Sequence, residues 1–142
     1  MKKFWLTTLS VLVIDQLSKY AIRSSIPLRS SVPLFPFLDF THISNTGVSF
    51  GLFQGFSEMW TLIALLIVGY IFYNYKELAT TPISTYAIGA IIGGALGNIL
   101  DRVLFGAVTD FIDFKIWPAF NIADTAISLG ALVLVYELWK EE

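Results

Sequence analysis

The sequence predicts a small membrane protein built mainly from α-helices, and three observations lead to this fold class. The chain has 142 residues, which is the length of a single domain. Hydrophobic residues make up 56% of it and charged residues only 14%, whereas a soluble domain carries about 25% charged residues. Four segments approach the roughly 20 apolar residues that a helix needs to cross a bilayer. Polar surface is therefore too scarce to coat a globule in water, and lipid is the solvent that fits.

The four apolar segments are expected to be transmembrane helices, at residues 4–22, 56–75, 83–100 and 119–139. The first could instead be a cleaved signal peptide, because Lys2 and Lys3 precede an apolar run. No A-x-A-like cleavage site follows it, however, and Asp15 and Lys19 interrupt the pattern. A spanning helix is therefore the preferred interpretation of this segment.

Two stretches between these segments are expected to lie outside the bilayer. Residues 27–57 hold three of the five prolines and only short apolar patches, which favours a small β-rich region on one membrane face. Residues 103–118 link the third and fourth segments on that same face. Lysines at 2, 3, 76 and 140 share the other face, so the positive-inside rule slightly favours cytoplasmic termini. The whole chain, 1–142, is then one membrane-embedded domain.

The composition also restricts the chemistry. The chain has no Cys, which excludes disulfides, thiolate ligands and a Cys nucleophile. His42 is the only His, so a zinc site lacks its usual ligands and we expect neither a metal nor a cofactor. The net charge of −2 argues against a nucleic-acid partner. Hydrolytic chemistry would have to use carboxylates, hydroxyls or Lys.

Ionised residues inside the first segment are the first sign of function. One such residue near the centre of a spanning helix costs about 2.5 to 3.5 kcal/mol and usually marks a functional site. Asp15 and Lys19 are four residues apart, so they share one helix face and can form an ion pair. We expect this pair to orient the loop that carries Asn45. A pair that only holds helices together is an equally good interpretation, and it predicts no chemistry.

A second polar group lies at the end of the third segment. Asn98, Asp101 and Arg102 are spaced by three and four residues, which puts them on one side of a helix. Arg102 could hold a carboxylate in a bidentate fork. The run GGALG before them provides small residues for close helix packing. The alternative is a helix end at the membrane surface with a snorkelling Arg.

Aspartates near the start of the fourth segment suit peptide hydrolysis. Two carboxylates that share one proton can act without a metal or Cys: the ionised one activates a water, and the protonated one polarises the scissile carbonyl. Asp110 and Asp124 fit this role because both are expected near the same membrane surface. Asp113 is the main rival of Asp110, although both also fit solvated loop positions, and Asp124 also fits a capping arrangement at the start of the fourth helix. Asn121 is suited to cap the fourth helix.

Five motifs contain most of these residues, and they occur along the chain in the same order as in a known protein family. They are Asp15-Gln16-x-Ser18-Lys19, Asn45-Thr46-Gly47-Val48-Ser49-Phe50, Gly93-Gly94-Ala95-Leu96-Gly97-Asn98-Ile99-Leu100-Asp101-Arg102, Val108-Thr109-Asp110-Phe111 and Phe120-Asn121-Ile122-Ala123-Asp124. Each block alone is weak, but five in order around four apolar segments are a specific signal. On these blocks the chain resembles signal peptidase II, the prolipoprotein signal peptidase, over essentially its whole length.

The resemblance implies an intramembrane aspartyl endopeptidase that removes signal peptides from prolipoproteins just before a diacylglyceryl-modified Cys. It implies four transmembrane helices with a small extracytoplasmic β-rich domain, in the bacterial inner (cytoplasmic) membrane, with the active site toward the outer face. Its implied partners are prolipoprotein substrates, membrane lipid and globomycin-type inhibitors. It implies that the catalytic residues are Asp110 and Asp124. The implied supporting residues are Asp15, Lys19, Asn45, Asn98, Arg102 and Asn121.

Two features depart from the family pattern. Only 13 residues separate Asp110 from Asp124, a connection shorter than the family's, and Ser49 stands where Ala is common. A competing class is a proton-coupled carrier, because intramembrane Asp and Lys also serve proton relays. That class does not explain why Asn and Asp gather toward one membrane face. A scaffold without catalytic activity leaves nearly all of the polar groups unexplained.

Overall fold

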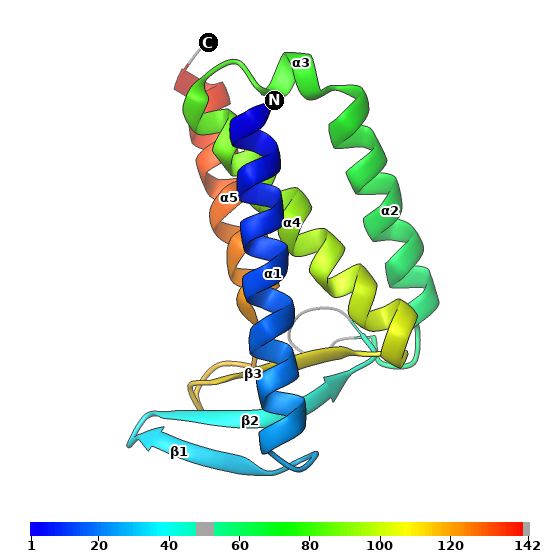
Figure 1. Cartoon of the computed structure of the whole chain (residues 1–142), viewed down its shortest axis with the longest axis vertical. Coiled ribbons are helices and arrows are strands. Elements are labelled where there is room, and N and C mark those ends of the chain that lie inside the picture. Colours follow the sequence, from blue (N-terminus) through cyan, green and yellow to red (C-terminus); the bar gives the residue numbers. More distant parts are fainter. Residues whose placement is uncertain (48–52, 141–142) are drawn as a thin grey trace.

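The computed structural model describes residues 1–47 and 53–140. Its elements are α1 (Lys2–Ser25), β1 (Ser31–Phe35), β2 (Leu38–Asn45), α2 (Ser57–Tyr73), α3 (Tyr75–Leu78), α4 (Pro82–Phe105), β3 (Val108–Asp113) and α5 (Ile122–Lys140). The long helices α1, α2, α4 and α5 run along the long axis, and the strands form a sheet across one end (Figure 1). The start of α1, the end of α5 and α3 lie at the opposite end.

Each expected span corresponds to a helix, and two of these helices meet the length and hydropathy of a membrane span. Within the described ranges they are α4 and α5, each with a mean hydropathy of 1.5. The helix α2 has 17 residues and is apolar but slightly shorter. The helix α1 has 24 residues and carries charged side chains. The structure is thus mainly helical with a small sheet, as expected.

The ends of α4 are set by local sequence. Thr81 caps the start: its side chain accepts from Ser84 N, and its own N donates to Ser84 Oγ at 2.9 Å. Pro82 follows, where its missing N–H is harmless. The helix ends at Phe105, and the cap residue Gly106 adopts φ 73°, a conformation that favours glycine. It therefore continues five residues beyond the expected end at residue 100, and the polar residues that follow are helical.

The helix α4 is the central helix, and its glycines allow close approach on two sides. A Cβ at Gly93 would lie 2.6 Å from the carbonyl oxygen of Thr8 in α1. A Cβ at Gly94 would lie 2.6 Å from the carbonyl oxygen of Ala123 in α5. The small residues thus allow the close helix packing that the sequence predicts, and they do so on two faces of α4. These two close contacts bring polar side chains of α1, α4 and α5 within hydrogen-bonding reach.

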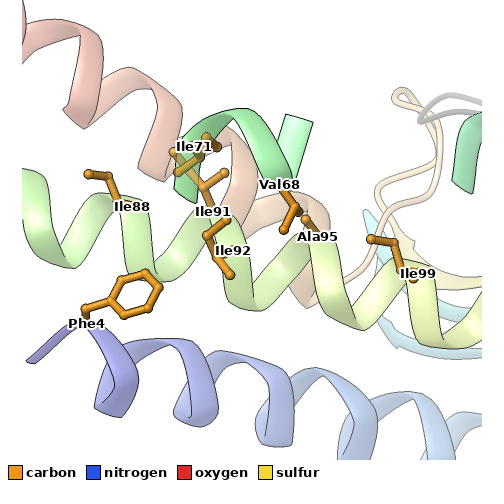
Figure 2. Close-up of a cluster of buried hydrophobic side chains, with 8 residues drawn as sticks. All are labelled: Phe4, Val68, Ile71, Ile88, Ile91, Ile92, Ala95 and Ile99. Carbon is orange, nitrogen blue, oxygen red and sulfur yellow. The ribbon is translucent and has the colours of Figure 1, made fainter. Parts of the chain in front are cut away.

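Apolar side chains of α1, α2 and α4 form the main core cluster. Figure 2 shows Phe4 of α1 against Ile88 and Ile92 of α4, and all three are almost completely buried. Large apolar side chains also cover the outside: Leu66 of α2 is 64% exposed and Leu132 of α5 is 69% exposed. An apolar outer surface over long helices is suited to contact with lipid chains.

The sheet is antiparallel with the strand order β1-β2-β3. The first two strands lie in the predicted β-rich region 27–57, but β3 comes from the link 103–118, where no strand was expected. Its residues 108–111 are all buried, so the alternation that marks a half-exposed strand is missing. Ile43 of β2 pairs with Asp110 of β3, and Asn45 pairs with Val108. This pairing places Asp110 beside the end of α4 and the start of α5.

Candidate active site

Asp110 lies on β3 with only 2% of its surface exposed. Asn45 Nδ2 donates to its Oδ2 at 2.9 Å, and Asn121 Nδ2 donates to its Oδ1 at 2.8 Å. Burial, followed by the charge of Asp124, raises the pKa of Asp110 to about 7, although the two amide donors act in the opposite direction. This carboxyl group can therefore both hold and release a proton near neutral pH.

Asp124 lies in the first turn of α5, beside the amide that holds Asp110. Its Oδ1 accepts from Asn98 Nδ2 at 2.8 Å, and its backbone N donates to Asn121 Oδ1 at 2.9 Å. Asn121 therefore caps α5, as predicted, and the backbone N of Thr125 donates to its carbonyl at 3.2 Å. One amide side chain contacts both aspartates, and this fixes the position of β3 relative to α5.

Both aspartates line one pocket of about 310 Å³. Its polar end also contains Asn45, Asn98 and Arg102. Its apolar walls come from α2, α4 and α5, and they are formed by Trp60, Ile63, Ala64, Ile67, Ile91, Ala95 and Ile127. A pocket with a few convergent polar groups and long apolar walls suits a ligand that is itself mostly apolar.

The predicted pair of Asp15 and Lys19 is confirmed. Lys19 Nζ lies 2.8 Å from Asp15 Oδ2, and both side chains are fully buried. Lys19 also donates to Asn98 Oδ1 at 2.9 Å, and Asp15 Oδ1 accepts from the backbone N of Ala123 at 2.9 Å. The pair thus holds Asn98 and the start of α5 rather than the Asn45 loop, because α1 packs directly on α4 and α5 at this depth.

The expected role of Arg102 as a carboxylate fork is wrong. Its Nη2 donates to the carbonyl oxygen of Gly47 at 2.9 Å, and no carboxylate of the described residues lies within 4.0 Å of it. The guanidinium that contacts a carboxylate is Arg23 of α1, whose Nη1 lies 3.4 Å from Asp101 Oδ1. Adjacent helical residues point about 100° apart, so Asp101 faces α1 while Arg102 faces the pocket.

Asp101 links β3 to the helices, a role that the sequence did not predict. It is fully buried, and its Oδ2 accepts from the backbone N of Thr109, next to Asp110, at 2.9 Å. Its Oδ1 accepts from Gln16 Nε2 at 3.1 Å. Both Asp101 and Gln16 lie in recognised motifs, but their spacing gives no information on which neighbours they contact. They hold the strand that carries Asp110.

Asp113, the rival of Asp110, lies outside the pocket. Three positions separate the two on β3, so they point to opposite faces of the strand. Asp113 Oδ2 accepts from Thr41 Oγ1 at 3.0 Å, and its Oδ1 accepts from the backbone N of Lys115 at 2.8 Å. Its contacts are those of a residue that joins strands. Val48, Ser49 and Phe50 of the second motif lie outside the described residues.

A pocket lined by two aspartates, at one end of an apolar helical fold, defines the class of the protein as a membrane enzyme. Two solved structures, both described as bacterial membrane enzymes determined by the in meso method, have the same fold. The structure at 2.3 Å resolution has a TM-score of 0.92 and 32% identity, covering 99% of this chain and 90% of that chain. The structure at 1.9 Å resolution has a TM-score of 0.88 and 32% identity, covering 100% and 96%.

The family model described as signal peptidase (SPase) II matches residues 7–140. Relatives named lipoprotein signal peptidase support the same family assignment. That of Halothermothrix orenii is 33% identical over 139 residues, 97% of this chain and 96% of the relative. That of Moorella thermoacetica is 39% identical over 137 residues, 95% and 91% of the two chains. The chain belongs to the signal peptidase II family and is an aspartic-type peptidase, which confirms the resemblance found in the sequence.

Proposed function

We propose that this enzyme removes the signal peptide of diacylglyceryl-modified prolipoproteins by cutting just before the lipidated Cys, with Asp110 and Asp124 as the catalytic pair. One observation carries the assignment of the pair. Asn121 contacts both residues, through Nδ2 to Asp110 and through Oδ1 to the backbone N of Asp124, and both carboxylates line the same pocket. The apolar walls of that pocket suit a substrate whose signal helix and acyl chains lie in lipid.

The pair shares one proton during catalysis. The ionised carboxylate takes a proton from a water, whose oxygen forms a bond to the scissile carbonyl carbon. The protonated carboxyl donates a hydrogen bond to the carbonyl oxygen. The C–N bond then breaks, and a proton passes from the pair to the leaving amine of the lipidated Cys. The pKa of about 7 at Asp110, raised by burial and by Asp124, is suited to this exchange at neutral pH.

The supporting residues hold the two carboxylates in place. Asn45 and Asn121 donate to Asp110, and Asn98 donates to Asp124. Asn98 in turn is held by Lys19, which is paired with Asp15. Arg102 lines the pocket and donates to the Gly47 carbonyl, so its side chain supports the wall beside the substrate. Buried amide donors of this kind orient a carboxylate without neutralising it.

The same function requires a particular membrane topology. We propose four spans, at residues 4–22, 56–75, 83–100 and 119–139, in the bacterial inner membrane, with cytoplasmic termini and the active site toward the outer face. The burial of its charged residues supports the assignment of α1 as a span. Asp15 and Lys19 are fully buried, while Leu6 and Leu17 are 68% and 63% exposed. The helix therefore presents an apolar surface to lipid. The sheet lies at the end of the helices opposite the start of α1 (Figure 1).

Cysteine labelling tests this topology. The chain has no Cys, so single Cys variants have no background. In intact spheroplasts, a membrane-impermeant thiol reagent is expected to label Ser30→Cys and Ile116→Cys but not Glu77→Cys. Ile116 is 94% exposed, and Glu77 is exposed in α3 at the far end of the helices. Labelling of the Glu77 variant alone would show that the membrane orientation is the opposite of the proposed one.

Cleavage of a defined precursor tests the activity itself. Purified enzyme in lipid nanodiscs is expected to cut a diacylglyceryl precursor just before the lipidated Cys, and to cut the unlipidated precursor far more slowly. Each buried CH₂ contributes about 0.8 kcal/mol, so the acyl chains hold the substrate at membrane depth. Globomycin-type cyclic peptides are expected to block the reaction by occupying the same pocket. Equal rates on both precursors would show that the enzyme does not recognise the lipid, but they would not contradict the aspartyl mechanism.

A further inference from the structure

Gln54 lies between β2 and α2 and contacts the residues at the end of β2. Its Nε2 donates to Asn45 Oδ1 at 2.9 Å. Its Oε1 accepts from both the backbone N and the Oγ1 of Thr46, at 3.0 and 2.7 Å. Gln54 itself does not line the pocket. We propose that Gln54 is a positioning residue of this enzyme, which acts through the amide of Asn45 to determine which atom of Asn45 faces Asp110.

The orientation of the Asn45 amide follows from its neighbours. An Asn side chain offers an oxygen that accepts and an NH₂ that donates. Two donors face Asn45 Oδ1, namely Gly47 N at 2.9 Å and Gln54 Nε2 at 2.9 Å. The NH₂ group must then point the other way, toward Asp110 Oδ2 at 2.9 Å. The reverse orientation would set an oxygen against a carboxylate and an NH₂ against two donors.

Gln54 is oriented by the same rule. Because Thr46 donates twice to Oε1, the NH₂ of Gln54 is the group left to meet Asn45. The Oγ1 of Thr46 also accepts from the backbone N of Gly55 at 2.9 Å, which directs its proton toward Gln54. Two amides thus form a relay in one direction, from Thr46 through Gln54 and Asn45 to Asp110.

The relay affects how Asp110 ionises, and the inference rests on the proposed catalytic role of Asp110. The charged groups around this carboxylate are Asp124 of α5, Lys19 of α1 and Arg102 of α4, and none of them belongs to the relay. The Asn45 donor lowers the pKa of Asp110 against the larger effect of burial. Loss of this donor raises the pKa further, so the pH at which the pair holds one proton moves upward.

A substitution that changes one atom of the relay provides the test. Gln54→Glu keeps the length and the acceptor for Thr46 but replaces the donor NH₂ with an oxygen. Asn45 can then keep its NH₂ toward Asp110 only with its oxygen against the new carboxylate, and turning over relieves that repulsion although it breaks the bond from Gly47 N. The turned amide presents its oxygen to Asp110, and this oxygen can accept from the protonated form of Asp110 but not from the ionised form. We expect a loss of about tenfold in kcat on the lipidated precursor, with the pH–rate curve moved up by about half a pH unit or more.

Two further variants separate the relay from other effects of the change. Gln54→Met keeps the length without polar atoms and is expected to lose less activity than Gln54→Glu, because Gly47 N still orients Asn45. Asn74→Asp makes the same amide-to-acid change beyond the far end of α2, and it is expected to leave both the rate and the pH curve unchanged. Rates are measured over a pH series at low and high salt, with thermal unfolding of each variant in the same nanodiscs.

Each outcome decides for or against the relay. A pH shift that persists at high salt, with unfolding temperatures near that of the parent, supports amide reversal, because a through-space charge effect at an exposed site is screened by salt. A shift that vanishes at high salt, or an equal loss in the Met and Glu variants without any shift, overturns the relay. If Asp110→Asn is inactive while Gln54→Glu keeps the parent curve, only the relay fails. If Asp110→Asn is active, the proposed function fails and the relay with it.

Discussion

Replacing either Asp110 or Asp124 with Asn is expected to abolish cleavage of the lipidated precursor. Each carboxylate is assigned a proton transfer, and general acid–base groups contribute about 10²- to 10⁴-fold each, so each change is expected to lower the rate by about that range. Asn has nearly the same shape and keeps one oxygen that accepts from a neighbouring amide, although at position 110 its NH₂ then faces the second amide donor. Folding should therefore persist, which thermal unfolding in detergent can verify beside the initial rates.

Asp113→Asn is the matched control for this experiment. Its carboxylate lies on the same strand but bonds to Thr41 and to the backbone of Lys115, away from the pocket. We expect it to retain most of the activity. Full activity of either the Asp110 or the Asp124 variant would remove that residue from the catalytic pair, and loss in the Asp113 variant alone would transfer the role to Asp113.

Lys19→Ala is expected to cause the largest loss of stability. Lys19 Nζ lies 2.8 Å from Asp15 Oδ2 and 3.7 Å from Asp101 Oδ2, and all three side chains are fully buried. Breaking a buried pair by removing one partner typically costs about 3 to 5 kcal/mol, because the remaining charge is uncompensated. The measurement is thermal unfolding in detergent, and the expected result is a clear fall in the unfolding temperature.

The double variant Asp15→Asn with Lys19→Gln serves as the comparison. It removes both charges of the pair, while Asp101 keeps its contacts to Arg23 and to the backbone of Thr109. We expect the double variant to unfold at a higher temperature than Lys19→Ala alone. The same unfolding temperature in both variants would show that the charge left on Asp15 is solvated, in conflict with its complete burial.

Much of the fold could be predicted because it depends on local patterns. An apolar run of about 20 residues predicts a long helix wherever it occurs. The spacing of Asp15 and Lys19 puts them on one helix face, and the structure has the expected ion pair. Capping by Asn121 likewise depends only on the turn that follows it. The strand β3 was missed because its first four residues are all buried, so it lacks the alternation that marks a strand.

The sequence by itself determined that the chain is helical and apolar and that its chemistry rests on a few carboxylates and amides. Only the tertiary structure decided which of these groups meet. Asn45 and Asp110 are 65 residues apart, Lys19 and Asn98 are 79 apart, and Asp15 contacts the backbone of Ala123 across 108 residues. The periodicity of a helix or a strand predicts which way a side chain points from that element, but not which other element it meets. The contacts between elements depend on how α4 packs through its glycines and how β3 pairs with β2, and these determine that Arg23 holds Asp101 while Gln54 orients Asn45.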